Sequence, residues 1–127
     1  MRRLRGEEGL TSTALAVLMP ALLIWIMLTV QYGLWFHAKQ VAGAAAAEAV
    51  SAAKVPGGTS EAGQIAAESF LTQSGNLEEI TVTVDRASDV VRVEITGAAP
   101  QLVPGIRWSV TARAESATER FIPQPER

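Results

Sequence analysis

Hydrophobic and polar positions follow three different patterns along the chain. A long stretch is almost wholly apolar, the next places alanines at helical spacing, and a later region alternates apolar and polar residues with a period of two. These patterns predict a long helix followed by a short helix and several strands. In order, the segments are a charged leader, an apolar helix, an alanine-rich helical extension, a small α+β domain and a tail: 1–9, 10–36, 37–55, 56–120 and 121–127.

The apolar stretch is long enough to cross a membrane. No Asp, Glu, Lys or Arg occurs between Glu8 and Lys39. As a helix, residues 10–36 would be about 40 Å long, against about 30 Å for the hydrocarbon core of a bilayer. A secretory signal has an apolar region of only about 7–15 residues, so a retained transmembrane helix is the better interpretation. Pro20 removes one backbone hydrogen bond inside this helix, and we expect a kink there.

The residues that flank the apolar stretch predict its orientation. Three of the first five residues are arginines, and basic residues beside a membrane segment stay on the cytoplasmic side. Tyr32, Trp35 and Phe36 lie at the other end, where aromatic rings favour the headgroup region, so we interpret them as interfacial anchors. The N-terminus is therefore expected in the cytoplasm and the C-terminal domain outside it.

The alanine-rich stretch is expected to continue the same helix into water, to about Ala53, because alanine is the best helix former. Gly43 and Ala47 form a small-xxx-small pair, which permits the close approach of another helix. Further alanines recur at helical spacing and form a strip: Ala38, Ala42, Ala45, Ala46, Ala49 and Ala53. Two interpretations are open for these small residues. They pack against a partner, or the protein's own small domain covers them.

Breaker and capping residues mark a short helix after the long one. The cluster VPGGTS ends the first helix, and Thr59 or Ser60 is able to cap a second. This second helix is predicted to end at Gly75. It should place three apolar side chains near one face: Ile65, Phe70 and Leu71.

Alternation with a period of two predicts three strands. Apolar and polar residues alternate over 80–84 and 91–95, and a short polar loop around Asp85–Asp89 joins these runs as an antiparallel hairpin. A third strand is expected over 106–113, with Ile106 on its apolar face. A three-stranded sheet with one apolar face needs a cover, which the short helix or the outer part of the long helix can provide. The predicted fold class is α+β.

Composition excludes several kinds of chemistry. The chain has no cysteine, which removes disulfides, thiolate nucleophiles and cysteine-based metal sites. After the apolar stretch, the chain has eight basic and eleven acidic residues, so no groove for nucleic acid is expected.

The single histidine, His37, is predicted at the membrane edge, away from any cleft for a Ser–His–Asp site. Glu78 and Glu79 are neighbours on a strand and so point to opposite faces, and Asp85 and Asp89 match no calcium loop. We therefore expect no enzyme activity, no metal and no cofactor.

A short charged leader ends in Gly9, and an apolar helix with an internal proline at Pro20 and the alanine-rich extension follow it. In these features the N-terminal part of the sequence resembles the TadE-like family, pilin-related single-pass proteins of bacterial tight-adherence (Flp-type) pilus assembly systems. The resemblance implies a pilin-like protein of the inner membrane with a structural role beside other pilus or secretion assembly proteins. It also implies a prepilin peptidase as a partner, which would cut between Gly9 and Leu10.

One position departs from the pilin pattern and keeps other functions open. Pilin-like proteins commonly carry glutamate at the fifth residue after the processing glycine, and here that residue is Ala14. Without a buried carboxylate, the helix is easier to hold in lipid as a lone anchor. The first alternative is therefore a stand-alone, membrane-anchored binding or envelope adaptor domain outside any filament. The second is a secreted β-rich protein that signal peptidase releases by cutting near GAAAAEA.

Overall fold

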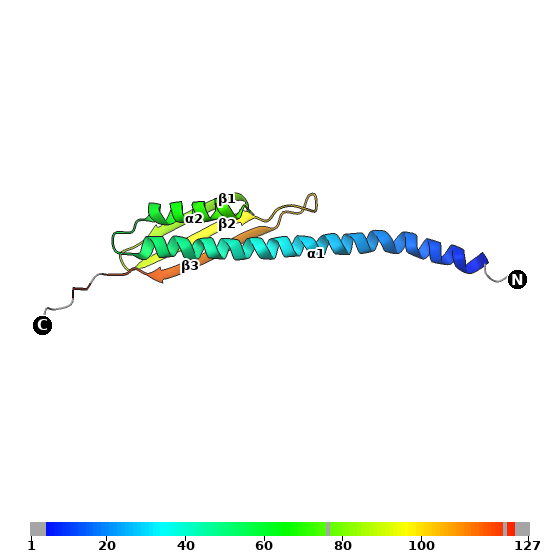
Figure 1. The fold of residues 1–127 in the computed structure, drawn as a ribbon, viewed down its shortest axis with the longest axis horizontal. Coiled ribbons are helices and arrows are strands. Elements are labelled where there is room, and N and C mark those ends of the chain that lie inside the picture. Colours follow the sequence, from blue (N-terminus) through cyan, green and yellow to red (C-terminus); the bar gives the residue numbers. More distant parts are fainter. Residues whose placement is uncertain (1–4, 76, 121, 124–127) are drawn as a thin grey trace.

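The structure is a computed structural model that describes residues 5–75, 77–120 and 122–123. It contains a long helix, a short helix and a three-stranded antiparallel sheet (Figure 1). The predicted α+β fold class is therefore confirmed. The first part of the leader and most of the tail lie outside the described residues. In chain order, the elements are α1 (Arg5–Lys54), α2 (Ser60–Ser74), β1 (Glu78–Arg86), β2 (Val90–Ala98) and β3 (Ser109–Ala117).

α1 is a continuous helix of 50 residues, which corresponds to about 75 Å. Its C-terminal half packs against α2 and the sheet, which together we call the head (residues 56–120), whereas its N-terminal half projects alone (Figure 1). The helix passes through Pro20 without a break, and the ribbon curves gently in its N-terminal part. The kink expected at Pro20 stays a prediction. At the other end, Arg86 Nε donates to the Ala53 carbonyl at 2.8 Å, which satisfies one of the last carbonyls of the helix.

Local capping signals fix both ends of α2. Thr59 is the N-cap, and its side-chain oxygen accepts a hydrogen bond from the Ala62 amide at 3.0 Å. Gly75 is the C-cap with a φ of 61°, in the left-handed region that glycine adopts without strain. Both predicted ends are confirmed.

The buried face of α2 differs from the predicted one. Gly63, Ala67 and Leu71 follow each other at four-residue intervals and are buried, and Phe70 is partly buried beside them. The prediction for Ile65 is wrong, because its side chain is 59% exposed. Ile65 comes two residues after Gly63, which places it on the opposite side of a helix with 3.6 residues per turn.

The sheet has the strand order β1–β2–β3, with both neighbouring pairs antiparallel. The first two strands form the predicted hairpin. The third strand is displaced from its predicted position: it begins at Ser109, and Ile106 lies in the preceding loop with 46% of its surface exposed. A turn causes this displacement, because Gly105 has a φ of 83° and the Ile106 amide donates to the Val103 carbonyl at 3.4 Å.

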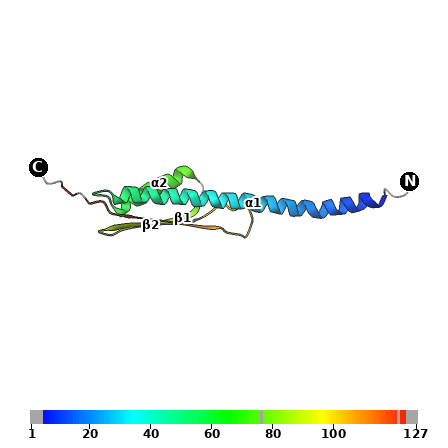
Figure 2. The same ribbon diagram turned by 90° about the horizontal axis from the view of Figure 1, so that it is seen from below.

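Both helices cover the same face of the sheet (Figure 2). α1 lies mainly over β2 and β3, and α2 lies over β1. Every alanine of the predicted strip is 0% exposed and belongs to one buried cluster with branched residues of the sheet such as Val93, Ile95 and Val110. Small side chains on α1 let the helix rest close to these branched ones. The protein's own domain therefore covers the alanine strip, as the second of the two interpretations proposed.

The two helices approach each other closely at Gly63. A Cβ at this position would lie 2.9 Å from the Ala49 carbonyl oxygen and 3.1 Å from the Ala53 Cβ. The first distance is too short for any side chain unless the backbone moves. Glycine at this position thus allows α2 to pack against the outer end of α1.

Candidate assembly and membrane-facing surfaces

The N-terminal half of α1 carries an extended apolar surface. Within the described residues, α1 is the one helix that is long and apolar enough to cross a membrane, and no other part of the chain buries its apolar window. Exposed apolar area of this extent marks an interaction with lipid or protein. This indicates single-pass anchoring in a membrane. Side chains with more than half of their surface exposed are Leu15, Val17, Leu18, Leu22, Leu23, Ile24 and Trp25.

The three aromatic residues at the end of the apolar stretch divide between two surfaces. Trp35 is partly buried against the head: its Nε1 donates to the Ser109 carbonyl at 3.1 Å, and its ring meets Trp108 edge-on with 6.1 Å between centroids. Tyr32 and Phe36 are exposed, and their rings stack with 6.4 Å between centroids. Trp35 therefore has a packing role that the sequence did not indicate. The interfacial-anchor interpretation stays a prediction, and only Tyr32 and Phe36 are free of the head.

Gln31 is the polar residue at which the head meets the apolar stretch. Its side chain is fully buried beneath the loop that joins β2 and β3 (residues 99–108, the β2–β3 loop). The Gln31 amide nitrogen donates to the Pro100 carbonyl at 3.1 Å, and its oxygen accepts from the amides of Leu102 at 2.8 Å and Val103 at 3.4 Å. These bonds hold the loop against α1. Sequence reasoning missed Gln31, whose one signal is an amide side chain in an otherwise apolar stretch.

This contact shortens the part of α1 that lipid can surround. The predicted membrane segment, 10–36, includes Gln31 and Trp35, which the head covers. None of residues 11–30 is buried, and residues 10–30 measure about 31 Å as a helix. The hydrocarbon core of a bilayer is roughly 30 Å thick. The part of the segment before Gln31 is thus long enough to cross the core, and the bounds 10–36 stay a prediction.

The small-xxx-small pair lies on the face of α1 that points away from the head. Gly43 and Ala47 are exposed, whereas the preceding residues, Ala42 and Ala46, are buried. A Cβ built on Gly43 would meet nothing within 4 Å. The structure thus separates two sets of small residues on one helix. The alanine strip packs on the head, and the Gly43–Ala47 pair stays open to a neighbour.

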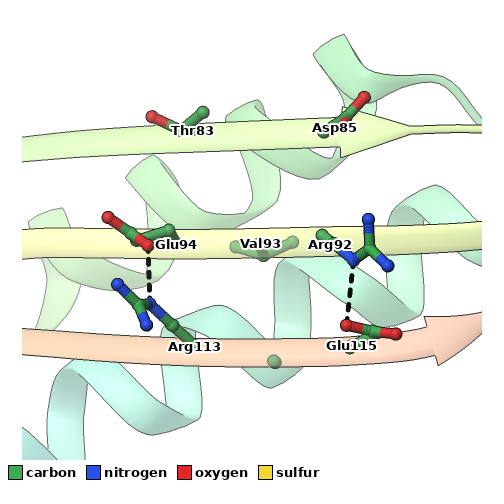
Figure 3. A pocket seen from close by; sticks show the side chains of 8 residues that line it. Thr83, Asp85, Arg92, Val93, Glu94, Arg113 and Glu115 are labelled. Carbon is green, nitrogen blue, oxygen red and sulfur yellow. Dashed lines mark hydrogen bonds and ion pairs between the residues drawn. The ribbon is translucent and has the colours of Figure 1, made fainter.

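The face of the sheet that points away from the helices is polar (Figure 3). Arg113 Nε pairs with Glu94 Oε2 at 2.6 Å, and Arg92 Nε pairs with Glu115 Oε2 at 3.0 Å, beside a shallow hollow of about 290 Å³. The hydrogen bond to Glu115 raises the pKa of the Arg92 guanidinium. Exposed pairs contribute little to stability, because water and salt screen their attraction. This face is therefore a solvated charged surface and adds little to the core.

The expected processing site lies inside α1. The helix already begins at Arg5, so residue 9 is not a structural boundary between leader and helix. Thr13 Oγ1 donates to the Gly9 carbonyl at 2.8 Å, which adds a side-chain bond at this end of the helix. Cleavage between Gly9 and Leu10 would therefore require the first turns of α1 to unwind. Processing at this bond stays a prediction.

The comparison with protein families concerns this same helix. Residues 9–51 match the family model described as TadE-like protein. This segment therefore resembles TadE-like proteins. The match confirms the resemblance over about a third of the chain and ends three residues before the end of α1. No curated protein and no solved structure matches the chain.

The TadE-like segment contains the parts of α1 that carry the candidate surfaces. Gln31, the Gly43–Ala47 pair and most of the alanine strip all lie inside it. The TadE-like family points to tight-adherence pilus assembly with a membrane-spanning helix. The head lies outside the match, and its arrangement comes from the structure alone.

Candidate chemistry is sparse in the part of the chain that the structure describes. No group of three or more His, Cys, Asp or Glu side chains there is placed to hold a metal ion. His37 is exposed on α1. Glu79 lies at an irregularity in the pairing of β1 and forms an ion pair with Arg107. The expected lack of enzyme activity and cofactor stays a prediction.

Proposed function

We propose that this protein is a pilin-like structural component of a tight-adherence (Flp-type) pilus or a related secretion system, held in the inner membrane by α1. The observation that carries the proposal is the open face of α1 at Gly43 and Ala47, inside the TadE-like segment. Small residues let two helices approach closely and gain many dispersion contacts. The protein then acts by packing α1 against a helix of an assembly partner and by presenting its head.

The proposed orientation places the N-terminus in the cytoplasm and the head outside. Its support is the arginine-rich start of the chain and the lack of charge until Lys39. In this orientation, the bond between Gly9 and Leu10 lies at the cytoplasmic face, where a prepilin peptidase would act.

A stand-alone, membrane-anchored adaptor is the second candidate. Ala14 favours it, because the residue that commonly supplies a buried carboxylate in pilin-like proteins is apolar here. The adaptor needs α1 only as an anchor and makes no use of an open helix face. The two functions therefore differ in what the Gly43–Ala47 pair contacts.

Enlarging the open face should disrupt assembly without harming the head. We expect the double variant Gly43→Leu with Ala47→Leu to stay in the membrane, because leucine is a good helix former and both positions are exposed. A photo-crosslinker at the exposed Gln40 position reports neighbours of this face. Its adducts with other membrane proteins should fall at least about fivefold, which corresponds to about 1 kcal/mol of association.

The matched control keeps both positions small. The double variant Gly43→Ala with Ala47→Ser should give the same yield of crosslinked adducts as the unsubstituted protein. If the leucine variant crosslinks as well as this control does, no close helix neighbour uses the face, and the adaptor is the better function.

An introduced cysteine tests orientation and processing together, since the chain has none of its own. Thr111 is exposed on the outer face of the sheet. In spheroplasts that contain a prepilin peptidase, a membrane-impermeant maleimide should label the Thr111→Cys protein. The mass of the labelled protein should match a chain that begins at Leu10. Labelling only after lysis would reverse the orientation, and a labelled chain that begins at Met1 would exclude processing.

A further inference from the structure

The β2–β3 loop extends from the membrane-proximal end of the head, along the side of α1 toward its N-terminus (Figure 1). Its base is closed by the Ala99 amide, which donates to the Trp108 carbonyl at 3.0 Å. The tip turns at Gly105. Between these points the loop has no regular secondary structure beyond its turn, so its path depends on the contacts that it makes.

Gln31 fixes that path. The side chain of Gln31 bonds to the carbonyl of Pro100 and the amides of Leu102 and Val103, and it is fully buried in doing so. Backbone groups that enter an apolar medium must be satisfied internally, because lipid offers no hydrogen bonds. The hydrogen bonds of Gln31 satisfy these backbone groups in the part of the loop nearest α1.

The position of Gln31 along α1 sets the depth of the loop. The helix from residue 10 to residue 30 matches the thickness of a hydrocarbon core, about 31 Å against roughly 30 Å. Gln31 then lies at the outer boundary of the bilayer. The loop bound to it lies at the same level, together with the exposed rings of Tyr32 and Phe36.

The side chains of the loop suit that level. Leu102 is 43% exposed and Ile106 is 46% exposed. No charged residue occurs between Glu94 and Arg107. Arg107 is paired with Glu79 of β1. Before Arg107, the exposed part of the loop is thus uncharged and, apart from Gln101, apolar, and the charge of Arg107 is paired within the head.

We propose that the β2–β3 loop is a second membrane contact: Leu102 and Ile106 insert into the outer interface of the bilayer, and Gln31 locks the loop to α1. The inference rests on the proposed membrane anchoring of α1. Lipid is the favoured occupant because the loop is continuous with the lipid-facing surface of α1 and lies where the bilayer must end. The head is then held at a fixed depth and angle on the membrane, which limits the directions from which assembly partners reach the Gly43–Ala47 pair.

Single-cysteine labels measure this depth, since the chain has no cysteine of its own. Leu102→Cys, Leu22→Cys and Ser88→Cys are each coupled to an environment-sensitive NBD fluorophore, and the full-length protein is reconstituted in phosphatidylethanolamine–phosphatidylglycerol vesicles. Leu22 is an exposed residue within the apolar part of α1, and Ser88 is exposed in the β1–β2 turn of the head. Nitroxide lipids with the spin label near the headgroup or deep in the chain then quench the emission.

We expect the label at Leu102 to have blue-shifted emission and to be quenched most by the shallow nitroxide. The label at Leu22 should be quenched most by the deep nitroxide, and the label at Ser88 should be quenched by neither nitroxide. Ile106→Cys repeats the measurement at a second loop position, in case the label at Leu102 disturbs the Gln31 contact.

Three outcomes would overturn the proposal. If Leu22 is quenched and neither loop position is, α1 still anchors the protein, but the loop stands clear of the bilayer. If the loop labels are blue-shifted but unquenched, a protein surface covers the loop, and a second copy of the chain would be the first candidate. If Leu22 is also unquenched, the proposed membrane anchoring fails together with the loop contact.

Discussion

The Ala46→Leu protein should lose a large part of the stability of its head. Ala46 is 0% exposed and belongs to the core of the head. A larger side chain in a well-packed core forces its neighbours apart, which typically costs about 1–3 kcal/mol. A single core of this size supplies only roughly 3–5 kcal/mol. For so small a domain, we expect the melting temperature to fall by at least about 5 °C.

The next residue along the helix provides a matched control. Ala47 is exposed, and Ala47→Leu makes the same change in volume and helix propensity at a position of α1 that the head does not cover. Melting is followed in detergent micelles by near-ultraviolet circular dichroism, which reports the packing of Trp35 and Trp108. The Ala47→Leu protein should melt at the same temperature as the unsubstituted protein. Equal losses of stability in both variants would contradict the assignment of one face of α1 to the head.

The Trp35→Ala protein should release the membrane-proximal end of the head from α1. The substitution removes the hydrogen bond to the Ser109 carbonyl and the edge-on contact with Trp108. Truncation of a buried tryptophan typically lowers the free energy of unfolding by about 3–5 kcal/mol. Because Trp35 is only partly buried, we expect a loss near the lower end of this range. Hydrogen exchange should speed up most in the β2–β3 loop and at the start of β3.

Phe36→Ala separates this packing role from an interfacial one. Phe36 is exposed, and its aromatic contact is with Tyr32 of the same helix. Hydrogen exchange in the head should therefore match that of the unsubstituted protein. If the two substitutions alter exchange equally, or if Trp35→Ala leaves exchange at Ser109 unchanged, Trp35 is only an interfacial anchor.

The sequence by itself determined the elements whose signals are local. The uncharged stretch before Lys39 is sufficient to predict a long membrane-compatible helix, because length and apolarity alone decide that property. Thr59 and Gly75 end α2 through contacts within a few residues, so capping preferences predict both positions. The hairpin of β1 and β2 follows likewise from alternation around a short polar turn.

Only the tertiary structure decided which surfaces are used. The alanine strip and the Gly43–Ala47 pair have similar side chains, and the sequence cannot tell which of them the head covers. Gln31 and Trp35 bond to backbone groups about 70 residues later in the chain, and Ile106 leaves the expected strand because of a turn in the same loop. Helical periodicity and caps describe a residue relative to its near neighbours. The packing partner of a helix face depends on where a distant segment lies, and no local pattern contains that information.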